Sequence, residues 1–333
     1  MKKRMFKIAM IGALVFAAII SLVSCADKKE DNNDTIKVGI IQYVSHPSLD
    51  NCYEGIVSAL QSSSIASKIE IDRQIGSNSA AESDCGTFAR TMVSKKYDLI
   101  FAIATPAATT TFAATEGTDI PVVFCAVSDP VLANLVSSMD IPGDLCTGTS
   151  DVLDLSAQLD LIQALQPDVK KIGILYTTSE ANSISNLAVM RELAEKRDLV
   201  IDAVGIQRDS DIPAAAAALA SRVDCINNFT DNKVVANLAV VLDAAKTAGI
   251  PVYGSEIEQV KNGCLAAASI DYVALGKVTG EMGLSVLDGA DIKTMAVRTI
   301  SDATPVINTD VLEALELKMP EQYASVETVK TNP

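Results

Sequence analysis

The chain has 333 residues, of which 42 are Asp or Glu and 27 are Lys or Arg, giving a formal net charge of −15. An acidic balance of this size argues against nucleic acid and against anionic lipid surfaces as binding partners. The sequence has one histidine and no CxxC spacing, so we expect no metal site.

The first 24 residues are predicted to be a signal peptide. Basic residues open this segment, and the apolar run that follows is too short to span a membrane comfortably. The run ends at Leu22-Val23-Ser24-Cys25, which is similar to the lipobox of bacterial lipoproteins and makes Cys25 the lipidated N-terminus. An ordinary secretory signal with a chance cysteine is the alternative. Residues 25–35 are predicted to be a disordered tether, so we expect a lipid-anchored protein on the outer side of the bacterial cell membrane.

The roughly 310 residues that follow exceed the usual size of one domain. Apolar strand-like runs at 36–43, 68–74, 98–104, 121–127 and 146–149 alternate with helical patterns at 48–61, 80–94 and 106–115. Near-continuous apolar strands that are separated by amphipathic helices indicate a parallel sheet covered on both faces. The sequence therefore predicts an α/β doubly wound fold.

Short segments of the first half recur in the second half in the same order. Residues 37–41, KVGII, return as 171–175, KIGIL, and the IPV at 120–122 returns at 250–252. Asp98-Leu99-Ile100 has its counterpart in Asp224-Cys225-Ile226. We interpret this as a duplication that gives two α/β lobes of one topology, with two unrelated runs of βα units as the alternative.

Six cysteines follow Cys25. An even number in an exported protein is compatible with disulfides. Several of these cysteines lie inside apolar runs, where a free thiol serves as a small hydrophobic side chain, and this context favours buried free thiols. The sequence leaves their pairing open. The residues are Cys52, Cys85, Cys125, Cys146, Cys225 and Cys264.

Polar side chains gather where the predicted strands end, which is where ligands bind in open parallel sheets. Most of them are also good helix caps, so capping and ligand contact are both open for each. His46, the single histidine, is predicted to contact a ligand, with capping of the helix near Ser48 as the alternative. The candidate ligand-binding residues are Tyr43, Ser45, His46, Thr105, Pro106, Ala107, Ser128, Asp129, Tyr176, Ser179, Glu180, Asn182, Thr230, Asp231, Asn232, Tyr253, Ser255, Glu256 and Asp271.

These loops suit a small zwitterion, because they contain several carboxylates but almost no Lys or Arg. The helix N-termini after Thr105 and Ser128 are expected to hold its carboxylate through backbone N–H groups. Asp231 is expected to bind its ammonium group, assisted by Asn232, Glu180 or Asp271. Tyr43, Tyr176 and Tyr253 would flank its side chain.

No catalytic motif is present. The sequence lacks GxxxxGK[ST], GxSxG, and a GxGxxG after its first strand. No serine has the sequence context of a nucleophile that His46 would activate. We therefore expect neither an enzyme nor a cofactor.

Motifs along nearly the whole mature chain resemble those of the ABC-transporter solute-binding proteins of the tryptophan/tyrosine-binding type. The resemblance implies a periplasmic-binding-protein type I fold, in which two Rossmann-like lobes are joined by three crossovers and close on a ligand. It also implies an aromatic amino acid as ligand, and a permease with its ATPase as partners. The motifs are VGIIQY at 38–43 with His46, DLIFAIATPAA at 98–108, VSDP at 127–130, GTSD at 148–151, IGILY at 172–176, SEANS at 179–183 and TDN at 230–232.

The resemblance and the duplication together predict the domain boundaries. We expect lobe 1 at 36–150 plus 272–298 and lobe 2 at 151–271 plus 299–325, with a loose tail at 326–333. We expect a monomer. The alternative function is a ligand-binding module that serves a membrane sensor or chemoreceptor.

Overall fold

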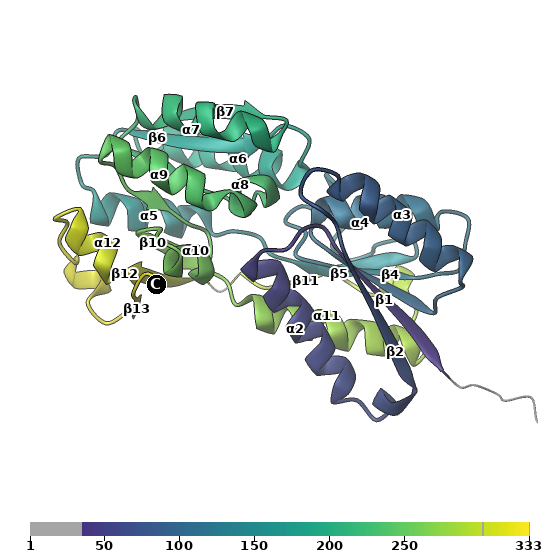
Figure 1. Cartoon of the computed structure of the whole chain (residues 1–333). Coiled ribbons are helices and arrows are strands. Elements are labelled where there is room, and N and C mark those ends of the chain that lie inside the picture. The colour runs from purple at the N-terminus through teal and green to yellow at the C-terminus, as the bar shows by residue number, and fades with distance from the viewer. Residues whose placement is uncertain (1–34, 302, 333) are drawn as a thin grey trace, which may run out of the picture. The chain divides into compact units, whose positions relative to one another are not determined.

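The computed structural model describes residues 35–301 and 303–332 (Figure 1). The predicted signal peptide, Cys25 and all of the tether except Thr35 lie outside these residues. In the described part of the chain, no helix combines the length and the apolar character needed to cross a membrane.

The first sheet is wholly parallel, with the strand order β2-β1-β3-β4-β5-β11. Its central strands are buried along their whole length because helices cover both faces. The strands are β1 (Ile36–Gln42), β2 (Ile69–Ile75), β3 (Leu99–Ile103), β4 (Val122–Cys125), β5 (Cys146–Ser150) and β11 (Arg298–Thr299).

Two pairs of helices cover this sheet (Figure 1). Helices α2 (Pro47–Gln61) and α11 (Tyr272–Leu287) lie together on one face, and α3 (Ala81–Ser94) and α4 (Thr105–Thr115) on the other. Glycines permit the close approach of α2 and α11. A Cβ at Gly276 would lie 2.1 Å from the carbonyl oxygen of Cys52. This packing holds the first turn of α2, which carries Ser48 and Leu49, against the rest of the lobe.

The second sheet repeats the strand order of the first one, β7-β6-β8-β9, with all pairs parallel. Hydrogen bonds from Leu265 N to Val252 O (2.7 Å) and from Gly254 N to Ala266 O (2.9 Å) then connect β9 to β10. Strand β10 pairs antiparallel with β12, which pairs parallel with β13. The strands are β6 (Lys171–Thr177), β7 (Val200–Ile206), β8 (Cys225–Asn227), β9 (Val252–Tyr253), β10 (Ala266–Ser269), β12 (Thr304–Asn308) and β13 (Glu327–Val329).

Helices α5 and α6 pack together, as do α7 and α9. The helices of this part are α5 (Leu155–Leu165), α6 (Ala181–Glu195), α7 (Ile212–Ala220), α8 (Asn232–Ala236), α9 (Leu238–Ala248), α10 (Ile257–Lys261) and α12 (Thr309–Ala314). Four short 3₁₀ helices complete the described elements, η1 (Ala66–Lys68), η2 (Asp209–Asp211), η3 (Ile292–Thr294) and η4 (Glu321–Tyr323).

The chain passes from one sheet to the other after β5, after β10 and between β11 and β12. Two α/β lobes of one topology, joined by three crossovers, confirm the predicted fold class. The boundaries given above, 36–150 plus 272–298 and 151–271 plus 299–325, stay a proposal.

Two local predictions were wrong. The tail is not loose over residues 326–332, because β13 pairs with β12 and Asn332 N donates a 2.7 Å hydrogen bond to Lys261 O. No helix follows Ser128. The segment 130–134 is a turn, in which Leu132 N donates to Asp129 Oδ1 at 2.9 Å. The prediction of buried free thiols is confirmed for all six cysteines of the described residues.

Candidate functional site

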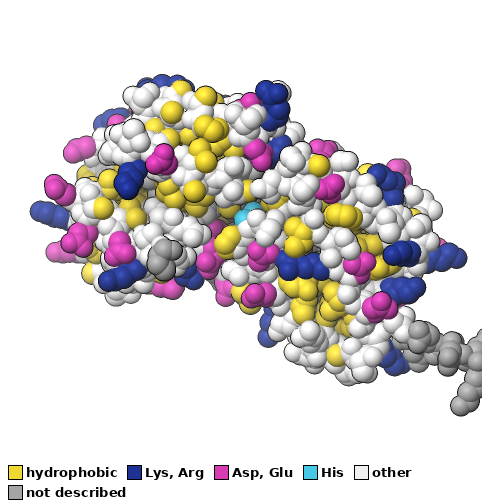
Figure 2. Space-filling view, in the orientation of Figure 1, with side chains coloured by type: hydrophobic (Ala, Val, Ile, Leu, Met, Phe, Trp, Pro, Cys, Tyr) yellow, Lys and Arg dark blue, Asp and Glu magenta, His cyan; other side chains and the backbone are white. Residues whose placement is uncertain are grey.

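A small cavity lies at the carboxyl ends of the strands of both sheets. Loops after β1, β3, β4 and β5 form one side, and loops after β8 and the helices α6, α8 and α10 form the other. Figure 2 shows the single histidine, in cyan, just reaching the surface at this place. The lining residues are His46, Ser48, Leu49, Ala104, Ala126, Ser128, Asp151, Asn182, Thr230, Asn232, Val235, Gln259 and Tyr272.

The cavity is narrow. Only about 10 Å³ of it can be reached by the centre of a water molecule. The two sides also touch, since Ser185 Oγ on α6 donates a 2.8 Å hydrogen bond to Asp129 Oδ2 in the loop after β4. An amino acid can therefore enter only if the walls move apart.

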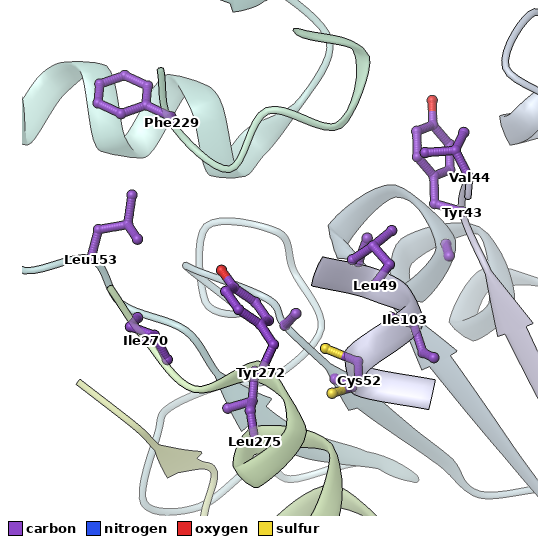
Figure 3. Packing of buried hydrophobic residues seen from close by; sticks show 14 of the residues in the cluster. Tyr43, Val44, Leu49, Cys52, Ile103, Leu153, Phe229, Ile270, Tyr272 and Leu275 are labelled. Atoms are coloured by element: carbon purple, nitrogen blue, oxygen red, sulfur yellow. The ribbon is translucent and has the colours of Figure 1, made fainter. Parts of the chain in front are cut away.

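Asp151 supplies the carboxylate in the cavity wall. It is 2% exposed, and it accepts hydrogen bonds from Ser128 Oγ (3.0 Å) and from the Tyr272 hydroxyl (2.8 Å). Burial raises the pKa of Asp151 to about 6, while these two hydrogen bonds hold it down. Figure 3 shows the Tyr272 hydroxyl pointing away from its own helix. Each carboxylate oxygen can accept two hydrogen bonds, so Asp151 keeps capacity for a further donor.

Four other lining residues carry buried polar atoms that have no hydrogen-bond partner. These are both ring nitrogens of His46, both amide atoms of Gln259, Oδ1 of Asn182 and Oγ1 of Thr230. Buried polar atoms are nearly always paired, and an unpaired one costs about 1–3 kcal/mol. Their concentration around one cavity indicates a place that a polar ligand completes.

His46 occupies the N-cap position of α2, but its side chain makes no capping hydrogen bond. The capping alternative therefore does not describe it. Burial lowers the pKa of His46 to about 4, and the nearby Asn232 side chain opposes this only in part. The imidazole is consequently neutral at pH 7, with one nitrogen as donor and the other as acceptor.

Two alanines in the cavity wall have a backbone conformation that usually requires glycine. Ala104 after β3 has φ +81°, and Ala126 after β4 has φ +58°. A strained backbone of this kind costs on the order of 1–3 kcal/mol and is concentrated at functional sites. Both side chains are small and buried, so these loops approach the cavity closely.

On the opposite side, Asp231 is fully engaged by its own lobe. Its carboxylate accepts from Thr177 N (2.5 Å), Thr177 Oγ1 (2.8 Å), Ser183 Oγ (2.7 Å) and Val234 N (3.0 Å). It caps α8 and ties that helix to the end of β6. With four donors on two oxygens and no exposed surface, Asp231 has no oxygen directed at a ligand.

Beside it, Glu180 Oε2 accepts from Asn232 N (3.1 Å), Asn232 Nδ2 (2.7 Å) and Asn182 Nδ2 (3.2 Å). Burial and the neighbouring Asp231 raise the pKa of Glu180 to about 8. Both asparagines line the cavity, so Glu180 stands behind its wall.

The structure brings five of the predicted residues into the cavity wall, which are His46, Ser128, Asn182, Thr230 and Asn232. Close behind them lie Thr105 and Ala107 in the first turn of α4, with the partly exposed Pro106 between them. Thr105 Oγ1 is buried and has no partner.

The remaining predicted residues are placed elsewhere. Tyr253 is fully buried and donates to Gln166 Oε1 at 3.1 Å, and Tyr176 packs beside Gly205 of β7. Tyr43 lines a separate open pocket with Lys233. The others are exposed or engaged in the protein. Three are exposed, namely Ser45, Ser179 and Asp271. Two are helix caps, Asp271 of α11 and Glu256 of α10. Ser255 donates to Asn228 O, and Asp129 accepts a hydrogen bond from Ser185.

Sequence patterns missed eight lining residues. Asp151 and Tyr272 follow β5 and β10, so the strand-end rule that found the others applies to them too. Ala104 and Ala126 gave no signal, because a positive φ at alanine cannot be read from the sequence. Ser48, Leu49, Val235 and Gln259 lie in first turns of helices, where their direction depends on packing.

No group of three or more His, Cys, Asp or Glu side chains in the described residues could hold a metal ion. The arrangement offers one carboxylate, several neutral donors and acceptors, and apolar walls. It has the means to bind a small polar molecule.

Comparison with known proteins agrees with this geometry. The family described as ABC transporter substrate binding protein matches residues 37–330. The chain belongs to this family. It is a solute-binding protein of an ABC transporter and not an enzyme, as its missing catalytic motifs predicted.

A tyrosine-binding protein from Clostridioides difficile is 36% identical over 300 residues, which cover 90% of this chain and 86% of that protein. Among solved structures, an ABC domain in complex with L-Trp from Streptococcus pneumonia has a TM-score of 0.85 at 33% identity, covering 89% of this chain and all of the other. The ligand-free, open structure of a Clostridium difficile substrate binding protein with adhesive properties has a TM-score of 0.68 at 36% identity, covering 90% and 100%.

More distant structures share the fold alone. A LacI-family regulator from Bifidobacterium animalis, 13% identical, has a TM-score of 0.54 over 89% of this chain and 98% of the other. Together with solute-binding proteins of similar distance, it establishes the type I periplasmic-binding-protein fold.

Proposed function

We propose that this protein captures an aromatic amino acid between its two lobes and delivers it to the permease and ATPase of an ABC importer. The proposal includes anchoring to the outer side of the membrane through a lipid on Cys25, which rests on the lipobox-like LVSC sequence. Incorporation of a labelled fatty acid into the wild type but not into Cys25→Ser tests the anchor.

The observation that carries the proposal is the group of unpaired buried polar atoms around the cavity. His46, Asn182, Thr230 and Gln259 offer both donors and acceptors without partners. A ligand with ammonium and carboxylate groups has the complementary set, three N–H donors and two acceptor oxygens. Binding it would remove the desolvation cost of these atoms.

The charges in the cavity wall indicate which residues bind the ammonium group and which bind the carboxylate group of the ligand. Asp151 is the carboxylate of the cavity wall, so it pairs with the ammonium group in place of Asp231, whose oxygens are occupied. No Lys or Arg lines the cavity. The ligand carboxylate is therefore held by neutral donors such as His46 and Gln259, which suits a zwitterion better than an anion.

The aromatic part of the proposal draws on the tyrosine-binding and L-Trp-bound relatives, and on the apolar lining. Tyr272, Leu49 and Val235 present apolar surface between the polar groups. A planar ring can lie against such surfaces and gain roughly 25 cal/mol for each Å² of apolar area that it buries.

Calorimetric titration of residues 35–333 with L-Trp, L-Tyr and L-Phe tests the function. We expect at least one to bind with Kd below about 100 µM, roughly −5.5 kcal/mol. D-Trp and L-Leu are the matched controls, and both should bind at least tenfold more weakly. If none of the three aromatic amino acids binds below this limit, the aromatic ligand is ruled out.

A further inference from the structure

Glu180 and Asp231 form a pair of buried carboxyl groups behind the cavity wall. Both accept from backbone N–H groups in the first turn of α8. Glu180 Oε2 accepts from the backbone N–H of Asn232, and Asp231 Oδ1 accepts from that of Val234. Glu180 is 2% exposed and Asp231 is 0% exposed. Water therefore screens neither group.

No cation in the described residues compensates this pair. Lys233 is adjacent in sequence, but its Nζ donates to Gln207 O at 2.9 Å. The imidazole of His46, which approaches Asn232, is neutral. Two neighbouring carboxyl groups without a cation cannot both ionise at neutral pH, so one of them keeps a proton.

The hydrogen bonds show which group keeps it. Both oxygens of Asp231 accept from donors, four in all. In Glu180 all three donors converge on Oε2, while Oε1 is buried without a partner. A buried carboxyl that has an oxygen without any donor is costly to ionise, and this assigns the retained proton to Glu180.

We propose that Glu180 is a positioning residue that acts in its protonated form, fixing the amide groups of Asn182 and Asn232 in the cavity wall and making ligand capture dependent on one retained proton. Asn182 Nδ2 donates to Glu180 Oε2 and to Thr230 O, while Asn182 Oδ1 has no hydrogen-bond partner. The inference rests on the proposed function for its ligand, but its proton can be observed without one.

Loss of the proton would place two negative charges side by side behind Asn232, next to His46, which we assign to the ligand carboxylate. Asp231 is one neighbour. The Tyr43 hydroxyl is another, because burial raises the pKa of Tyr43 and the charge of Glu180 raises it further. Asp151 on the far wall adds a third carboxylate. The pKa of Glu180, raised to about 8, puts this transition just above neutral pH.

Titration of wild type, Glu180→Gln and Glu192→Gln with L-Trp from pH 6 to pH 9 tests the proposal. Glu192 lies on the same helix, is exposed, and pairs only with Lys196, so it is the matched control. We expect wild type and Glu192→Gln to lose about tenfold in affinity per pH unit above pH 8. Glu180→Gln, which copies the neutral acid, should bind within about threefold of wild type at pH 6 and lack that additional loss. The ionisation of the ligand amine is common to all three proteins. Equal pH profiles in all three would overturn the proposal.

A second measurement needs no ligand and separates this proposal from the proposed function. A carboxyl with a raised pKa stabilises the fold fully below its unfolded-state pKa, and this stability is lost as pH rises through the folded-state pKa. Urea unfolding should show wild type losing stability relative to Glu180→Gln between pH 5 and pH 9, and no such difference for Glu192→Gln against wild type. If the difference in unfolding free energy between wild type and Glu180→Gln stayed constant over this pH range, Glu180 would not retain a proton, even if L-Trp binds. Should Glu180→Gln not fold, proton uptake by the unmodified protein on binding L-Trp at pH 8.5, beyond that of the ligand amine, decides the same point.

Discussion

The loops after β3 and β4 occupy the same positions in the first sheet as the loops after β8 and β9 in the second. In the first pair, Ala104 and Ala126 adopt positive φ, and small side chains bring the backbone close to the cavity. In the second pair, Asp231 and Glu256 cap the following helices with buried carboxylates. A duplicated topology thus places loops at one edge but does not fix what they contribute.

The difference is also energetic. In the first pair, backbone strain of order 1–3 kcal/mol per residue accompanies the conformation that brings the loops close to the cavity. In the second pair, charge-assisted hydrogen bonds, each worth about 1.5–3 kcal/mol, hold the loops to the helices that follow them. Asp151, which follows β5 where the chain leaves the first sheet, belongs to neither pair and is the group we assign to the ligand ammonium.

The largest effect is expected at Asp151. Asp151→Asn keeps the size of the side chain but removes the charge that faces the ammonium, so L-Trp affinity should fall by at least about 100-fold, near 3 kcal/mol. In wild type, affinity should also fall as pH decreases below about 6, because Asp151 then binds a proton. Calorimetry measures both effects.

The control is Asp271→Asn, which replaces an exposed N-cap residue with another residue that caps well and should retain wild-type affinity. Wild-type affinity in Asp151→Asn would remove Asp151 from the site.

Asp231 should affect stability more than recognition. Asp231→Ala leaves four buried donors without an acceptor, and we expect the free energy of unfolding in urea to fall by about 3 kcal/mol. Asp271→Ala, at an exposed cap of one hydrogen bond, should cost clearly less. If Asp231→Ala abolished L-Trp binding and left stability unchanged, the carboxylate would face the ligand after all, and the contrast between the two pairs of loops would fail.

The smallest effect is expected in the first pair. Ala104→Gly relieves the strain at φ +81° and should stabilise the protein by up to about 1 kcal/mol, after the entropy cost of glycine. Ala107→Gly is the control, since Ala107 is buried inside α4 and its replacement should destabilise by about 1 kcal/mol. Thermal and urea unfolding distinguish the two signs. A loss of stability in Ala104→Gly would show that the loop is not strained.

The sequence predicted the fold well because apolar periodicity and repeated segments such as KVGII and KIGIL report directly on buried strands. It predicted the edge of the sheets where the cavity lies, and five of its lining residues, because strand ends turn polar there. It could not rank those polar residues. Asp231 and Asp151 both end strands, and only the donors around each show that one supports a helix and the other faces the cavity.

Other failures have separate physical causes. Tyr176 and Tyr253 end strands as Tyr43 does, but their rings turn into the lobe. The expected helix after Ser128 is replaced by a turn, which reaches α6 through the hydrogen bond from Ser185 to Asp129.

The six unpaired cysteines of the described residues can report where and how often the protein unfolds locally. Four of them, Cys52, Cys85, Cys125 and Cys146, lie in helices and strands of the first sheet and its covering helices. In the second lobe, Cys225 lies in β8 and Cys264 in the loop between α10 and β10, and all six are 0% exposed. A thiol reagent in solution can reach them only when the surrounding packing is disrupted. Mass-spectrometric mapping of the modified cysteines over time would therefore rank the two lobes by how often each unfolds, without a single engineered label.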